Sequence, residues 1–345
     1  MQSIYASSFD AKSSVKAVDL EHRRKLNFNI SKYNAVVPKG KAQFPDLNRV
    51  RELAKNKKWE AIEHLDLYLT QFEDQITKRG AKVFWAEDSE QALNFIGDLC
   101  KEKQCKSVVK SKSMVTEEIH LNDYLTSIGV ESVETDLGEY IQQMDGEAPY
   151  HIVTPAMHKS KEDVAQLFNK HLGTDISLTP EQLTLVARKN LRDKYVQAEI
   201  GITGANFILS DIGGIALTEN EGNARLSVAW PKTHVVIVGI EKTIPSMNDL
   251  GLFWPLLATY GTGQQITVYN SIITGPRQPG EVDGPEEMYV ILLDNGRTDL
   301  LSNAKAREAL YCIRCGACLN ACPVYKNIGG HAYDTTYSGP IGSVI

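Results

Sequence analysis

The four cysteines between residues 312 and 322 constrain this chain more than any other feature. Residues 312–323 read CIRCGACLNACP, a spacing of C-x2-C-x2-C-x3-C followed by proline. Closely spaced thiolates on one tight loop can wrap a face of an iron–sulfur cubane, and Gly316 relieves the backbone strain of such a loop. The pattern therefore predicts a [4Fe–4S] cluster held by Cys312, Cys315, Cys318 and Cys322.

Zinc is the alternative metal for such a run. Structural zinc sites use two separated pairs of ligands, and this compressed run has no spacer between pairs, so iron–sulfur is favoured. In bacterial ferredoxins the fourth cysteine of this spacing ligates the other cluster of a pair. The second cysteine group that would then be needed is not in the sequence, which ends GPIGSVI. Either Cys322 closes the same cluster or the chain is truncated, and we expect truncation with incomplete clusters.

Composition narrows the function classes. The 345 residues are 42% hydrophobic and 23% charged, which is typical of a globular protein with a full core. The net charge of -6 argues against a general nucleic-acid binder. No segment has the length and apolarity of a membrane span, and Cys100 and Cys105 stand alone without a disulfide framework or signal peptide. We expect a soluble, cytoplasmic protein.

Hydrophobic periodicity indicates α/β architecture. Helical spacing covers residues 10–28 and 46–79, with an extended segment around Pro38, Gly40 and Pro45 between them. From residue 82 strands alternate with helices, which predicts βαβ units and a mostly parallel sheet. The expected strands are Lys82–Glu87, Ser107–Lys112, Val130–Glu134 and His151–Pro155, and the expected helices start near Ser89 and cover Met114–Ile128 and Lys161–His171.

The second half of the chain predicts one more helix and then several strands. Thr179-Pro180-Glu181-Gln182 is a strong helix start, with threonine as the cap and glutamine three residues later. The expected strands are Asn206–Ser210, Gly214–Glu219, Arg225–Trp230, His234–Ile240, Ile266–Thr274 and Met288–Asp294, before a helix at Leu301–Tyr311. We divide the chain into a helical N-terminal arm (1–59), an α/β domain (60–298) and a cluster module (299–345).

Two polar segments are candidates for substrate binding. Lys110 and Lys112 follow an expected strand and precede an expected helix, a position that suits an anion, although a solvated basic loop would look the same. Glu219 and Asn220 end another strand, although an ordinary hairpin turn accounts for them too. We expect both lysines to approach the Glu219–Asn223 turn at the carboxyl edge of the sheet, forming a polar pocket.

Several blocks of sequence carry a resemblance to a known family. They are ETDLGEYIQQ (134–143), HIVTPAMHK (151–159), GITGANF (201–207), LTENEGNARL (217–226), GTGQQ (261–265) and CIRCGACLNACPVY (312–325). Over about residues 50–345 the chain resembles the lactate utilization protein B family, the iron–sulfur subunits of a three-part bacterial system that oxidises L-lactate to pyruvate.

The resemblance implies a domain like those of ribose-phosphate isomerases and CoA transferases, followed by a ferredoxin-like module with two [4Fe–4S] clusters. Cys312, Cys315 and Cys318 would ligate the first cluster and Cys322 the second. Family members continue past a second cysteine group, which this sequence lacks.

Three function classes stay open. In the first class, the chain is an electron-transfer subunit that docks the sister subunits of a lactate oxidation complex. Alternatively, its α/β domain itself binds the organic acid, at Lys110, Lys112, Glu219 and Asn220, and the cluster takes the electrons. In the third class an isomerase-like enzyme carries a structural cluster. Convergence of those four residues on one pocket would favour the second class.

Overall fold

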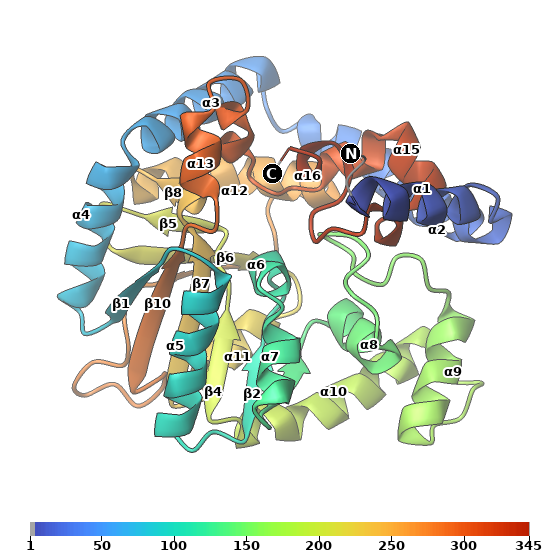
Figure 1. Cartoon of the computed structure of the whole chain (residues 1–345), viewed down its shortest axis with the longest axis horizontal. Helices are drawn as coiled ribbons and strands as arrows, with labels where there is room; N and C mark the ends of the chain where they lie inside the picture. Colours follow the sequence, from blue (N-terminus) through green and yellow to red (C-terminus); the bar gives the residue numbers. More distant parts are fainter. Residues whose placement is uncertain (1–3, 345) are drawn as a thin grey trace.

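The centre of the molecule is a parallel sheet with strand order β1-β10-β7-β4-β2-β3, in a computed structural model that describes residues 4–344 (Figure 1). All five strand pairs are parallel. The strands are β1 (Lys82–Ala86), β2 (Ser107–Lys110), β3 (Glu131–Glu134), β4 (Ile200–Thr203), β7 (Thr233–Gly239) and β10 (Glu287–Leu293). The predicted mixed α/β fold with a mostly parallel sheet is confirmed.

Both faces of this sheet are covered by helices, as parallel sheets require. Alternate residues of β7 enter two separate apolar cores: Val235 and Ile237 face one, and Val236 and Val238 face the other. The first core is closed by α5 (Ser89–Glu102) and α7 (Leu121–Ser127), and the second by α4 (Leu65–Thr77).

A second, smaller sheet packs beside the first. Its strand order is β8-β5-β6-β9, with β5–β6 and β6–β9 antiparallel and β5–β8 parallel. These strands are β5 (Phe207–Leu209), β6 (Gly214–Glu219), β8 (Thr243–Ile244) and β9 (Tyr269–Ile273). The remaining helices of this part are α3 (Leu47–Glu63), α6 (Met114–Glu118), α8 (Leu137–Asp145), α9 (Lys161–Leu172), α10 (Pro180–Gln197), α11 (Asn223–Ala229), α12 (Leu250–Thr262) and α13 (Arg297–Ser302), with the short turns η1 (Ile240–Lys242) and η2 (Met247–Asp249).

The N-terminal helices α1 (Ile4–Ala17) and α2 (Leu20–Lys41) cover the C-terminal part of the chain (Figure 1). Leu26 and Ile30 of α2 pack in one cluster with Leu319 and Tyr325. The C-terminal part consists of η3 (Arg307–Tyr311), α14 (Ala317–Ala321), α15 (Pro323–Ile328), η4 (His331–Tyr333) and α16 (Gly339–Gly342). We call residues 307–344 the cysteine segment. The expected arm boundary at residue 59 lies within α3.

Several expected elements are wrong. The segment around Pro38 is not extended, because α2 continues through it to Lys41 and packs closely on the end of α12: a Cβ at Gly40 would lie 2.6 Å from the Gly263 oxygen. The expected strand Arg225–Trp230 is helix α11, and the expected strand His151–Pro155 is irregular. The expected helix Met114–Ile128 is two helices, separated at His120, whose φ is 52°.

Candidate functional site

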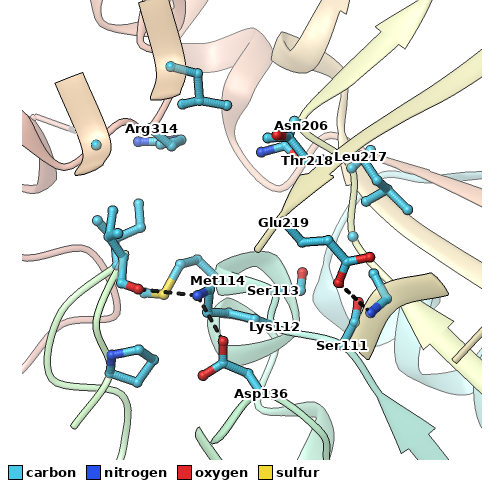
Figure 2. A pocket seen from close by; sticks show the side chains of 18 of the residues that line it. Ser111, Lys112, Ser113, Met114, Asp136, Asn206, Leu217, Thr218, Glu219 and Arg314 are labelled. Carbon is cyan, nitrogen blue, oxygen red and sulfur yellow. Dashed lines mark hydrogen bonds and ion pairs between the residues drawn. The ribbon is translucent and has the colours of Figure 1, made fainter. Parts of the chain in front are cut away.

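A cavity of about 540 Å³ lies at the carboxyl edge of the parallel sheet, between the sheet and the cysteine segment (Figure 2). Ser111–Met114 follow β2, Asp136 follows β3, and Glu241 and Lys242 follow β7. Ligands of open α/β sheets bind beyond the carboxyl ends of the strands, so the location is that of a binding site.

Lys112 is fixed on the sheet side of the cavity. Its Nζ donates to Asp136 Oδ2 at 2.9 Å and to the Val153 carbonyl oxygen at 3.1 Å. Burial alone would lower the pKa of Lys112, but the neighbouring Asp136 carboxylate outweighs it and raises this pKa above its usual value. The same Asp136 side chain accepts the Gly138 and Glu139 N–H groups at the start of α8. Lys112 is therefore a charged residue held in place by two hydrogen bonds.

Lys110 does not line the cavity. Its side chain is fully buried, with Nζ 2.6 Å from Glu134 Oε1 and 2.8 Å from Glu117 Oε1. Burial opposes its charge, yet these carboxylates raise the pKa of Lys110. Lys110 is the last residue of β2, and its side chain is buried against Glu117 and Glu134, whereas Lys112 lies past the strand end. The structure thus separates the two lysines that the sequence grouped.

Glu219 and Asn220 line the same cavity as Lys112. The Glu219 carboxylate accepts the N–H groups of Ala224 at 2.7 Å and Arg225 at 3.1 Å, at the start of α11. Burial raises the pKa of Glu219. The Asn220 amide exchanges two hydrogen bonds of 3.0 Å with Gln264. Three of the four expected substrate-binding residues therefore border one space.

The opposite side of the cavity is formed by the cysteine segment, through Arg314, Cys315 and Tyr337 (Figure 2 shows Arg314 across from Lys112). The Arg314 guanidinium lies 4.3 Å from the Tyr337 ring centroid, and its Nη2 is 3.4 Å from Glu241 Oε1. Sequence reasoning missed Arg314. The available signal was a cation placed between two cysteines in CIRC.

Glu241 belongs to a buried charge network behind Arg314. Arg297 Nε lies 2.5 Å from Glu241 Oε2, and Arg297 Nη2 lies 2.9 Å from Glu118 Oε2. Burial alone would raise the pKa of Glu241, but Arg297 and the neighbouring cations lower it to about 2. Glu241 is thus held ionised.

The four cysteines of the run are free thiols, each partly buried. Cys312 follows η3, Cys315 precedes Gly316, Cys318 lies within α14, and Cys322 joins α14 to α15. Gly316 has a φ of +76°, and a Cβ there would lie 2.9 Å from Ile152 Cγ2. The loop between Cys315 and Cys318 therefore packs closely against residues 151–153. Burial raises the pKa of the Cys315 thiol to about 11.

Backbone N–H groups are directed at these sulfurs. The Arg314 N–H lies 3.4 Å from Cys312 Sγ, and the Tyr325 N–H lies 3.5 Å from Cys322 Sγ. Hydrogen bonds to sulfur and soft thiolate donors are the features by which proteins hold and tune iron–sulfur clusters. The residues present therefore fit a cluster.

Fold and site together define an α/β protein whose sheet-edge cavity is closed by an iron–sulfur segment. Residues 69–293 match the family model of the LUD domain, so the chain belongs to the LUD domain family. Residues 308–344 match the model of a 4Fe-4S dicluster domain, which supports iron–sulfur binding by the cysteine segment.

Similar curated proteins carry one name. The chain is 46% identical over 296 residues to lactate utilization protein B of Bacillus licheniformis, covering 86% of this chain and 62% of that protein. It is 47% identical over 296 residues to lactate utilization protein B of Geobacillus sp. strain WCH70, with the same coverage of 86% and 62%. The chain thus spans just under two thirds of the length of these relatives, and the resemblance expected from its sequence is confirmed.

One solved structure is also similar, a DUF162 family protein from Deinococcus radiodurans. It is 14% identical, with a TM-score of 0.36, and the match covers 66% of this chain and 98% of that one. Within residues 4–344, no helix combines the length and the apolarity that crossing a bilayer demands.

Proposed function

We propose that this chain is the iron–sulfur electron carrier of a system that oxidises L-lactate to pyruvate. The relatives' name, lactate utilization protein B, supports lactate as the substrate. The observation that carries the electron-transfer role is the cysteine run itself, whose first loop borders the cavity through Cys315. Oxidation of L-lactate releases two electrons and two protons, and a thiolate-ligated cluster accepts electrons singly.

The finer proposal concerns cluster number and partners. In the intact protein Cys312, Cys315 and Cys318 would ligate a first [4Fe–4S] cluster and Cys322 a second. Sister subunits of the lactate oxidation complex would pass electrons to these clusters or receive them. An exposed apolar residue of α15, Val324, lies two positions after Cys322 and would contribute to such a contact.

Growth on lactate tests this proposal. The gene is deleted in a host without another lactate dehydrogenase, and L-lactate is the sole carbon source. We expect no growth, rescue by the native gene, and no rescue by Cys312→Ser. Normal growth of the deletion strain would overturn the lactate assignment. Full rescue by Cys312→Ser would overturn the electron-transfer role.

A second candidate is that the α/β domain itself binds the organic acid and that the clusters take its electrons. It is favoured by the position of Lys112, Glu219 and Asn220 around a cavity that Cys315 also borders. Anaerobic mixing separates the candidates: in the second, L-lactate reduces the clusters of the purified protein alone. Reduction that requires the sister subunits would favour the pure carrier.

A further inference from the structure

We propose that Arg314 is the recognition group of a carboxylate-binding site between the sheet edge and the cysteine segment. The ligand class is a small 2-hydroxy or 2-oxo monocarboxylate, a choice that rests on the second candidate function, in which this chain itself binds the organic acid. The site is a part of the cavity that the sequence-based candidates did not include, because its charge comes from the cysteine segment.

The first observation is that Arg314 is incompletely bonded. Its side chain is 9% exposed, yet its Nε and Nη1 have no hydrogen-bond partner among the described residues. A guanidinium stays charged in proteins, and buried N–H donors without acceptors are destabilising. A planar carboxylate is the ligand whose oxygens best satisfy guanidinium donors. The cavity beside Arg314 offers the room for one.

The second observation is that the nearest carboxylate is already engaged. Glu241 lies 2.5 Å from Arg297 but 3.4 Å from Arg314. Lys242 also borders the cavity, and within the described residues no carboxylate lies in ion-pair distance of its Nζ. By contrast, Lys112 on the facing side has Asp136 at 2.9 Å. Arg314 and Lys242 are therefore the cations of this cavity with the weakest carboxylate pairing among the described residues.

The third observation is the position of Arg314 between two cluster ligands. Its own N–H points at Cys312 Sγ, and the next residue is Cys315. The backbone of Arg314 has a φ of 60°, and Tyr337, which stacks on the guanidinium, donates a hydrogen bond to Glu118 at 2.7 Å. A carboxylate bound to this arginine would bring negative charge beside the cysteine ligands. Its binding should therefore make the cluster harder to reduce.

The experiment uses the anaerobically reconstituted protein and titrates it with pyruvate by calorimetry. We expect Arg314→Gln to weaken pyruvate binding by about tenfold or more, the effect of losing a charged hydrogen bond. Arg307→Gln is the matched control, because Arg307 lies in the same segment, pairs with Glu63 at 2.9 Å and does not border the cavity. This control should bind pyruvate normally. Methyl pyruvate, which lacks the carboxylate charge, should not bind.

Three results would overturn the inference: no pyruvate binding by the native protein, unchanged binding by Arg314→Gln, or equal binding of methyl pyruvate. If Arg314→Gln loses iron, the test uses Arg314→Lys, which keeps the positive charge but not the planar donors. Undiminished pyruvate binding by Arg314→Lys would contradict the proposal. A redox titration adds a readout independent of turnover, in which pyruvate lowers the cluster's reduction potential in the native protein and not in Arg314→Gln. Failure of the growth test with normal pyruvate binding would remove lactate oxidation and leave this site standing.

Discussion

The two sides of the cavity differ in how their charges are satisfied. On the sheet side, Lys112 is bonded to Asp136 and Val153, and Glu219 accepts two N–H groups of α11. On the side of the cysteine segment, Arg314 retains two nitrogens that have no hydrogen-bond partner within residues 4–344. On the sheet side, neighbouring protein groups satisfy the charged side chains named here. The cysteine segment instead presents donors and thiols that a ligand and a cluster would satisfy.

The largest effect should come from the cluster ligands. Cys315→Ser removes a thiolate, so iron in the reconstituted protein should fall by about one cluster's content. Iron analysis and visible absorption measure this. Cys105→Ser is the control, because Cys105 is a buried cysteine outside the cysteine segment. Unchanged iron in Cys315→Ser, or stoichiometric zinc in place of iron, would contradict iron–sulfur binding by the cysteine segment.

Acid should weaken the sheet side through His234. This histidine lies in β7, is fully buried and shares a 2.9 Å hydrogen bond with Thr203; burial lowers its pKa to about 3. Because the folded pKa lies below the unfolded value, the unfolded chain binds the proton first, and stability is lost as pH falls from about 6.5 toward 3. At pH 4 the loss should be about 3 kcal/mol.

Urea unfolding at pH 7, 5 and 4 measures this loss. His234→Gln should reduce the pH dependence without removing it, because burial also lowers the pKa of His151 to about 3, whereas His64→Gln, at an exposed position, should have no effect of this size. An equal slope in the native protein and in His234→Gln would show that the proton is taken up elsewhere.

Breaking the paired cation on the sheet side should cost stability. Lys112→Met leaves the Asp136 carboxylate, whose side chain is 6% exposed, without its ion pair, and we expect about 2 kcal/mol of destabilisation. Urea unfolding of the reconstituted protein measures it, with the exposed Lys106→Met as control. A loss no larger than that of the control would mean that the sheet side is not preformed.

The smallest effect on stability should come from the weakly paired cation, Arg314, whose contact with Glu241 is 3.4 Å. Arg314→Met removes a guanidinium with two unsatisfied nitrogens, and Glu241 keeps Arg297, so we expect a change below about 1 kcal/mol. The same unfolding measurement compares this variant directly with Lys112→Met. If Arg314→Met is the more destabilising of the two, the contrast between the two sides is wrong.

Local sequence signals predicted the parallel sheet and the cysteine run, because hydrophobic periodicity and ligand spacing are short-range properties. They failed where distant contacts decide. Residues 225–230, an expected strand, form helix α11, which packs against β4, a strand distant in the sequence. The contact is close at Gly201 of the buried strand β4, where a Cβ would come within 1.8 Å of the Ser227 oxygen in α11.

The candidate site was predictable to a similar extent. In a continuous strand, Lys110 and Lys112 would lie on the same face of the sheet. Because β2 ends at Lys110, their side chains have different environments. The CIRC motif could have drawn attention to Arg314, but its pairing could not be predicted, because Glu241 lies 73 positions away and is engaged by Arg297. A missing partner cannot be recognised from the order of residues.

The contact of the N-terminal helices with the cysteine segment has a consequence for the order of assembly. Ser8 donates to Asp334 across 326 positions of sequence, and the apolar face of α2 is buried against Leu319 and Tyr325. These helices are synthesised before the cysteine segment, yet their burial must await that segment, some three hundred residues later. Helices α1 and α2 therefore dock only after most of this chain has been made.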